Sequence, residues 1–294
     1  QTAEYSDILT EKDLKDNYEA AMAALRAKVE DVNKCVVAVD VEQPFSDVPT
    51  IESSQTEVAG LVVANVNSTY LVLTSSSLLE PGMNYIVRFS DEVQTEAAFV
   101  CRNTASGIGI VSINASKLTA EQRNSIAVAQ LDNSYMVKQG DLVIASGKLY
   151  ETSKGVSYGT IAGSKVEYSK DSGYEVFETS VSITAGGFAI LFNSEGNVVG
   201  VSKASTDTSS KFIGISDLKA QIETMINEHG IMYCGITGQN VTEELAVKYG
   251  LPSGVYISNV DIDSPAYYAG LQAGDVISAI NGQSILTIQQ FSEK

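Results

Sequence analysis

Residues 179–201 read TSVSITAGGFAILFNSEGNVVGV, and the second half of this segment alternates apolar and polar residues. A turn-forming run from Ser194 to Asn197 separates it from a β-branched run that begins at Val198. Short apolar runs on both sides of a four-residue loop are typical of a β-hairpin. Two adjacent glycines, Gly186 and Gly187, precede the hairpin. The segment therefore predicts a glycine-containing loop that leads into two paired strands.

The composition is that of an acidic globular protein. The 294 residues are 44% hydrophobic, which is enough to fill a sizeable core, and this length predicts two or three domains. A formal net charge of −17 argues against nucleic-acid binding and against electrostatic docking on anionic lipid. No run of 18 apolar residues occurs, so the sequence predicts no membrane-spanning helix.

Cysteine and motif content argue against metal and cofactor chemistry. Cys35, Cys101 and Cys234 have no metal-ligand spacing and are too few for a disulfide framework. Each lies in an apolar, strand-like run, so we expect free buried thiols. The sequence contains no H-E-x-x-H, no paired-cysteine motif and no P-loop. We therefore expect no metal and no cofactor.

The apolar pattern changes along the chain. Residues 11–33 have apolar side chains at helical spacing, which predicts either a helix packed on its own domain or a stalk for self-association. From Cys35 the pattern is one of many short strands separated by turns, typical of a sandwich or a pair of barrels. An amphipathic helix over residues 215–228 is expected to close this part. After Gly230 we expect a strand at 231–236. We then expect a helix from Thr242 to Tyr249 that Gly250 caps, and a strand from Val255 to Val260.

The last part of the chain contains a long, specific motif. Residues 263–277 read DSPAYYAGLQAGDVI and are followed by Ile280, Asn281 and Gly282. This run is very similar to the S-P-A-x-x-A-G-L-x-x-G-D-x-I signature of PDZ domains of the HtrA type. The resemblance implies an α+β PDZ domain over residues 229–294. Because the chain ends at Lys294, inside the expected groove helix, we expect this PDZ domain to be truncated at its C-terminus.

The region 35–228 resembles the trypsin-like serine proteases of the HtrA/DegP group. In that group T-D-A-x-I-x-P-G-N-S-G-G-P-L precedes a hairpin, and here Thr179, Ile183 and the hairpin match. The resemblance implies a mainly β protein: a helix and linker at 1–34, a trypsin-like double β-barrel at 35–228 and the PDZ domain at 229–294.

The family's catalytic triad is not matched. Its L-T-N-x-H-V motif aligns with residues 73–78, LTSSSL, so Ser77 stands at the general base. Its D-L-A-V-L-K-I motif aligns with GIGIVSI, so Gly107 stands at the aspartate. The nucleophile loop is one residue shorter, and Gly187 lies closest to the serine. Phe188 follows it, and we expect that side chain to fill the cleft.

Catalysis by a serine triad needs an imidazole to take and return a proton. The only histidine is His229, at the junction before the PDZ domain. A Ser-Lys dyad is the alternative, with Ser77, Ser180 or Ser182 and Lys148 or Lys165 as candidates, but the sequence fixes no such pair. We therefore expect a degenerate, non-catalytic protease domain.

The peptide-binding site of the PDZ domain is the site expected to survive. Such domains add a peptide as an extra strand and hold its C-terminal carboxylate on backbone N–H groups. The family's carboxylate loop, Y-Φ-G-Φ, aligns with Tyr233, Cys234, Gly235 and Ile236. We expect the pocket for the last peptide side chain to include Ile288 and Phe291.

The sequence thus predicts an HtrA-like pseudoprotease that binds protein or peptide C-termini or acts as a scaffold. Two alternatives remain open: an active serine endopeptidase with a non-standard catalytic arrangement, and an oligomeric assembly module. The resemblance implies an extracytoplasmic location and a part in protein quality control. It also allows an upstream membrane anchor and homo-oligomers, and a chain trimmed after a signal peptide or anchor would begin as this one does.

Overall fold

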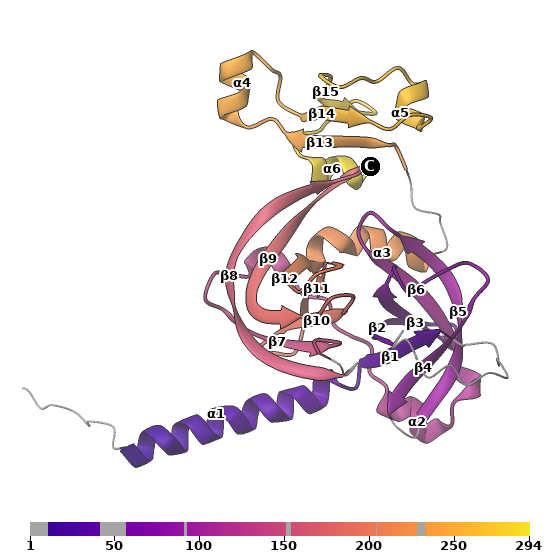
Figure 1. The fold of residues 1–294 in the computed structure, drawn as a ribbon, viewed down its shortest axis with the longest axis vertical. Helices are drawn as coiled ribbons and strands as arrows, with labels where there is room; N and C mark the ends of the chain where they lie inside the picture. The colour runs from indigo at the N-terminus through magenta and orange to yellow at the C-terminus, as the bar shows by residue number, and fades with distance from the viewer. Residues whose placement is uncertain (1–10, 42–56, 91–92, 151–153, 204, 228–232) are drawn as a thin grey trace, which may run out of the picture.

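A computed structural model describes residues 11–41, 57–90, 93–150, 154–203, 205–227 and 233–294 (Figure 1). Two closed, antiparallel six-stranded barrels make up the body. The first has the order β1-β2-β3-β6-β5-β4 and the second the order β10-β11-β12-β9-β8-β7. The predicted mainly β architecture of two barrels followed by a PDZ domain is confirmed.

The strands of the first barrel are β1 (Val36–Val41), β2 (Val58–Val66), β3 (Thr69–Ser75), β4 (Asn84–Ser90), β5 (Val93–Asn103) and β6 (Ile108–Asn114). Those of the second barrel are β7 (Leu142–Gly147), β8 (Gly155–Ser169), β9 (Ser172–Ile183), β10 (Ala189–Asn193), β11 (Val198–Ser202) and β12 (Ser209–Gly214). The hairpin predicted within residues 179–201 is β10 and β11, which pair antiparallel.

Side-chain alternation along the barrel strands builds one core inside each barrel and a larger core that the two barrels share. On β3, Tyr70 and Val72 point into the first barrel, whereas Leu71 and Leu73 belong to a larger core that contains residues of both barrels. Successive side chains of a strand point to opposite faces, so a strand at the barrel contact is apolar on both. Phe188 is fully buried in the shared core, and its predicted filling of the cleft stays a prediction.

Short helices connect and close the barrels. They are η1 (Ala115–Lys117), α2 (Ala120–Ser125), η2 (Ser134–Met136), η3 (Ile215–Leu218) and α3 (Lys219–Ile226). The closing helix predicted at 215–228 is η3 and α3, and the buried side chains of Ile222 and Met225 join the shared core.

The predicted N-terminal helix is α1 (Glu11–Val32). Its last turn is anchored, because Val32 is 3% exposed and belongs to the shared core. Its first turns project from the body (Figure 1), and Leu14 and Tyr18 are 56% and 66% exposed. One end of the helix therefore packs on the barrels and the other has no cover within the described chain, and self-association through that end stays a prediction.

The PDZ part contains β13 (Ile236–Asn240), α4 (Glu243–Tyr249), β14 (Val255–Val260), α5 (Pro265–Tyr268), β15 (Val276–Ile277), β16 (Ala279–Ile280), β17 (Gln283–Ser284) and α6 (Ile288–Ser292). Thr242 caps α4, and Gly250 ends it at a φ of 65°. The strand predicted at 231–236 is wrong for residues 233–235, because β13 begins only at Ile236; residues 231–232 lie outside the described residues.

The structure corrects two further predictions, the lengths of two strands and the burial of the cysteines. The strands predicted after Cys35 are short, but β8 and β9 are much longer than the apolar runs at 156–162 and 174–177 within them, because many of their other residues are polar. All three cysteines are free, but only Cys35 is fully buried, and burial raises the pKa of its thiol to about 12.

The expected domain junction at 228–229 lies outside the described residues, so the domain boundaries stay predictions. None of the helices in the described ranges is long and apolar enough to cross a membrane.

Candidate functional site

Two of the predicted triad positions meet where β3 ends and β6 begins. The backbone N–H of Ser76 donates to the carbonyl of Gly107 at 2.9 Å, and the hydroxyls of Ser75 and Ser77 lie 2.7 Å apart. Gly107 has a φ of +79°, a conformation that favours glycine over aspartate. Ser77 is exposed and its described side-chain hydrogen bond is to a second hydroxyl, which cannot act as a base at neutral pH.

The third predicted position, Gly187, lies in the second barrel just before β10. Its N–H donates to the carbonyl of Thr184 at 2.9 Å, and the N–H of Gly186 donates to the carbonyl of Ser205 at 3.0 Å. Both glycine amides are therefore engaged by backbone carbonyls rather than directed at a substrate oxygen. A Cβ atom on Gly187 would lie 2.3 Å from the carbonyl oxygen of Lys148. The backbone as folded has no room for a serine side chain there.

The other predicted sources of catalysis are placed as follows. His229 lies outside the described residues. Lys165, one candidate for a Ser-Lys dyad, forms ion pairs with Glu167 and Glu178 at 3.4 Å and 3.7 Å. The hydroxyl of Ser180 accepts a hydrogen bond from the backbone N–H of Thr160 at 2.9 Å. These contacts are structural and form no nucleophile–base pair.

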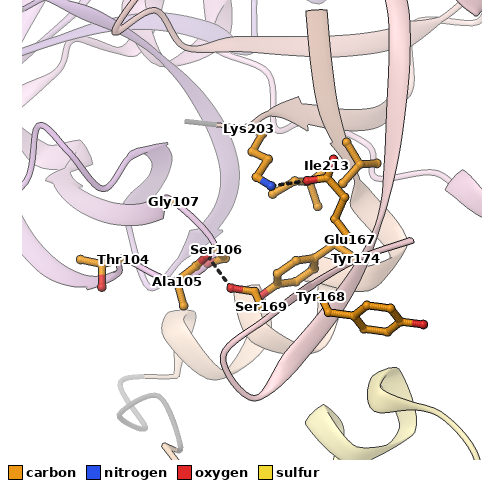
Figure 2. Close-up of a pocket in the computed structure, with 11 residues that line it drawn as sticks. Thr104, Ala105, Ser106, Gly107, Glu167, Tyr168, Ser169, Tyr174, Lys203 and Ile213 are labelled. Atoms are coloured by element: carbon orange, nitrogen blue, oxygen red, sulfur yellow. Dashed lines mark hydrogen bonds and ion pairs between the residues drawn. The ribbon is translucent and has the colours of Figure 1, made fainter. Parts of the chain in front are cut away.

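A pocket of about 120 Å³ lies beside Gly107 (Figure 2). Its walls come from the β5–β6 turn and from β8, β9 and β12, and Lys203 pairs with Glu167 on its far side. Hydrogen bonds from Lys203, together with Lys211, lower the pKa of the Glu167 carboxyl to about 2. The pocket is well below the ~300 Å³ at which small-molecule sites begin. It is a small, charge-paired hollow without an acid–base pair near neutral pKa.

The loop before β13 holds a carboxylate. The side chain of Asp171 accepts hydrogen bonds from the backbone N–H groups of Cys234 (2.9 Å), Gly235 (2.9 Å) and Ile236 (2.8 Å). Three of the four residues predicted for the carboxylate loop thus point their amides at one anion. Burial, and then the nearby charge of Asp171, raises the pKa of the Cys234 thiol.

The loop needs its glycine. Gly235 has a φ of +90°, and a Cβ atom there would lie 2.2 Å from Cβ of Ser264. This left-handed residue turns successive N–H groups toward the same point, which is how a backbone forms an anion-binding concavity. Sequence reasoning identified the loop but missed Asp171, because nothing in the local pattern links residue 171 to residue 235.

The remaining predicted residues lie around this loop. Tyr233 is exposed, and its hydroxyl donates to the carboxylate of Asp261 at 2.8 Å. Ile288 is fully buried in the core of the PDZ part, and Phe291 packs partly buried against the same core. A Cβ atom on Gly173, in β9, would lie 2.3 Å from a methyl group of Ile288. The β8–β9 hairpin therefore packs against α6, the helix expected to line the pocket for a peptide side chain.

Two domain families match the chain. Residues 58–201 match the trypsin-like peptidase domain, and residues 256–294 match the PDZ domain. Together with the two barrels and the carboxylate loop, these matches define the class: a trypsin-like peptidase fold followed by a PDZ domain.

Within that class the chain is similar to HtrA-type proteins. It is 27% identical over 226 residues to the probable periplasmic serine endoprotease DegP-like of Pseudomonas savastanoi pv. phaseolicola (strain 1448A / Race 6), covering 73% of this chain and 46% of the relative. Its identity to the protein of that name in Ectopseudomonas mendocina (strain ymp) is 28% over 226 residues, again 73% and 46% of the two chains. The chain thus spans about half the length of these relatives.

Solved structures agree on the fold. The HtrA-type protease AlgW with a decapeptide has a TM-score of 0.61 and 19% identity, covering 90% of this chain and 88% of that one. AlgW with a tripeptide also has a TM-score of 0.61, with 20% identity and coverage of 90% and 85%. At this level of identity the likeness extends to the fold alone.

Proposed function

We propose that this chain is a non-catalytic HtrA-like protein that binds protein or peptide C-termini through its PDZ domain. The observation that carries the proposal is the carboxylate held by the amides of Cys234, Gly235 and Ile236. A C-terminal carboxylate has the same charge and the same two oxygens as the Asp171 side chain. Charge-assisted hydrogen bonds of this kind are among the stronger ones in proteins.

The non-catalytic part of the proposal rests on missing chemistry. The chain has one histidine, and Ser77, Gly107 and Gly187 supply neither a base, an orienting carboxylate nor a nucleophile. Removing base and nucleophile together leaves only what an oxyanion hole and binding provide. The amides of Gly186 and Gly187 donate to protein carbonyls, so that remainder is small as well. The relatives are named serine endoproteases, and in this account the present chain keeps their scaffold without their activity.

The proposed cellular location of this chain is inferred from its relatives. Their names place them in the periplasm, which supports an extracytoplasmic role for this chain, either free or tethered. A part in protein quality control stays a prediction from the family resemblance. An assembly role is the second candidate function, because Leu14 and Tyr18 expose apolar surface on the projecting turns of α1. Self-association through that surface would be compatible with peptide binding.

The test of peptide binding compares two peptides that differ only in the C-terminal group, a free carboxylate in one and an amide in the other. We expect a fluorescein-labelled decapeptide with an apolar last residue and a free carboxylate to bind in a fluorescence-polarisation titration. The same peptide with an amidated C-terminus should bind at least about tenfold more weakly, a difference of ~1.4 kcal/mol, because the loop amides then lose a charged acceptor. Equal affinity for the two peptides would contradict a carboxylate site.

A further inference from the structure

We propose that Asp171 is a built-in ligand of the PDZ domain: the tip of the β8–β9 hairpin occupies the peptide groove, and an incoming C-terminus must displace it. This inference rests on the proposed function, since it concerns the same loop. Figure 1 shows β8 and β9 rising together out of the second barrel until their tip lies beside β13 and α6. The hairpin and the groove belong to different domains, and their contact joins residues more than sixty positions apart.

The first support is that Asp171 satisfies the loop as a peptide end would. Its carboxylate accepts from three successive backbone amides, those of Cys234, Gly235 and Ile236, while its own N–H donates to the carbonyl of Ile236 at 2.8 Å. A bound C-terminal residue is expected to combine one carboxylate with one ladder hydrogen bond in this way. A side chain here takes the place of a chain end.

The second support is strand pairing. Lys170 and Thr237 form an isolated antiparallel bridge, so the hairpin tip lies against the edge of β13 that a peptide would use. Strand addition at a sheet edge is how a PDZ domain gains affinity from the peptide backbone. With the tip in place, that end of the edge is already covered.

The third support is the close packing of the hairpin on α6, the helix expected to line the pocket for the last peptide side chain. Gly173 lies so close to Ile288 on α6 that a Cβ atom would come within 2.3 Å of its methyl group. A glycine at this position lets the hairpin press onto the helix that is expected to form the other wall of the groove. The tip thus meets the groove at both walls and at the carboxylate loop.

An ion pair also joins the tip of the β8–β9 hairpin to the PDZ domain. The ammonium of Lys170 lies 2.7 Å from the carboxylate of Asp261, which also accepts from the hydroxyl of Tyr233. Hydrogen bonding to Asp261 raises the pKa of the Lys170 ammonium, and the same contact lowers the pKa of the Asp261 carboxyl. Lys170 and Asp171, the two residues of the hairpin turn, therefore both bind the PDZ domain.

The consequence is competition within one molecule. A tethered ligand acts at an effective local concentration, and a peptide sees only the fraction of molecules in which the tip has left the loop. Its apparent dissociation constant is the intrinsic constant divided by that fraction. Removing the Asp171 carboxylate should therefore tighten peptide binding, although the variant loses contacts within the protein.

The turn geometry supplies suitable variants. Asp171 has a φ of +54°, which glycine adopts freely and which asparagine tolerates better than other side chains. Asp171→Gly removes the carboxylate and Asp171→Asn removes only its charge, and neither strains the turn. Asp207→Ala, at an exposed site between β11 and β12, removes the same charge away from the PDZ domain and is the matched control.

The experiment titrates the free-carboxylate decapeptide into the 294-residue chain and its variants by fluorescence polarisation. We expect Asp171→Gly to bind about tenfold or more tightly than the unmodified chain, with Asp171→Asn between them and Asp207→Ala unchanged. Amide hydrogen exchange gives a second readout that needs no peptide. The amides of residues 234–236 should exchange at least about tenfold faster in Asp171→Gly than in the unmodified chain.

The outcomes separate the inference from the function on which it rests. If all the chains bind the peptide with one affinity, the built-in ligand is refuted and the peptide-binding function stands. If no chain binds, the proposed function fails and this inference fails with it. Unchanged exchange at residues 234–236 in Asp171→Gly would also overturn the inference, because the carboxylate would then not protect the loop.

Discussion

At the residue scale, the backbone at two of the predicted triad positions bears on the proposed loss of catalysis. Gly107 has a left-handed φ of +79°, and Gly187 is enclosed by Lys148 O, Thr184 O and the Ile183 side chain. Gly187 has no room for a side chain in the backbone as folded, and the left-handed φ of Gly107 favours glycine over aspartate. We therefore expect a serine at position 187 to strain the loop rather than to restore a nucleophile.

Gly187→Ser tests this directly. Because its Cβ would lie 2.3 Å from a backbone carbonyl oxygen, we expect a loss of about 1–3 kcal/mol in unfolding free energy, the range for overpacked sites. Urea unfolding followed by circular dichroism measures it. Ala185→Ser, two residues away and exposed, is the control and should change stability by no more than ~0.5 kcal/mol. If Gly187→Ser is as stable as the unmodified chain, the loop has room for a nucleophile and our account of it is wrong.

At the element scale, α1 has two ends with different roles. Val32 belongs to the core shared by the barrels, whereas Leu14 is 56% exposed. We expect Val32→Ala to cost about 2 kcal/mol of unfolding free energy, the transfer of two methyl groups plus a small cavity term. Leu14→Ala should stay within ~0.5 kcal/mol.

The same pair of variants tests self-association through α1. Thermal or urea unfolding at two protein concentrations, with sedimentation at each, is the measurement. A large, concentration-dependent loss in Leu14→Ala would show that a partner covers the projecting turns, which would favour the assembly role.

The β8–β9 hairpin carries a charge cluster near its tip, centred on Glu167. Glu167 pairs with Lys165, Lys203 and Lys211, and hydrogen bonds from Lys203 hold the pKa of its carboxyl near 2, against an ordinary 4.5. Because the folded pKa is lowered, this stabilisation is complete above about pH 4.5 and is lost as the pH falls toward 2.

Glu167→Gln should remove that dependence. Between pH 6 and pH 3 its urea midpoint should fall less than that of the unmodified chain. Glu178→Gln is the control, since Glu178 is half exposed and its ion pair with Lys165 is longer, at 3.7 Å. Parallel loss of stability in Glu167→Gln and the unmodified chain would show that the lysine cluster does not act on folding.

At the scale of the whole molecule, local patterns predicted most of the elements. Apolar alternation gave the strands around the β10–β11 turn, helical spacing gave α1 and α3, and one specific motif gave the PDZ domain. The full length of β8 and β9 was missed because their distal residues, such as Lys165 and Glu167, are polar on a solvated hairpin. The seating of Asp171 on Gly235 is a contact between distant segments, and no periodicity carries that information.

The molecule also separates what the fold requires from what catalysis requires. Packing between the barrels requires only apolar side chains of suitable volume, such as those of Phe188 and Leu73 in the shared core. Catalysis requires particular groups at particular points, and the sequence comparison predicts Ser77, Gly107 and Gly187 at those points. Fold and function are therefore separate questions in this chain, and the site answers the second.

The measurement that bears most directly on the absence of catalysis treats the purified 294-residue chain with a serine-reactive fluorophosphonate and assays casein cleavage in parallel. A DegP-like relative serves as the positive control. We predict no stoichiometric label by intact mass spectrometry and no cleavage above a protein-free blank. Labelling of one serine per chain, together with cleavage that a substitution of that serine abolishes, would contradict the account.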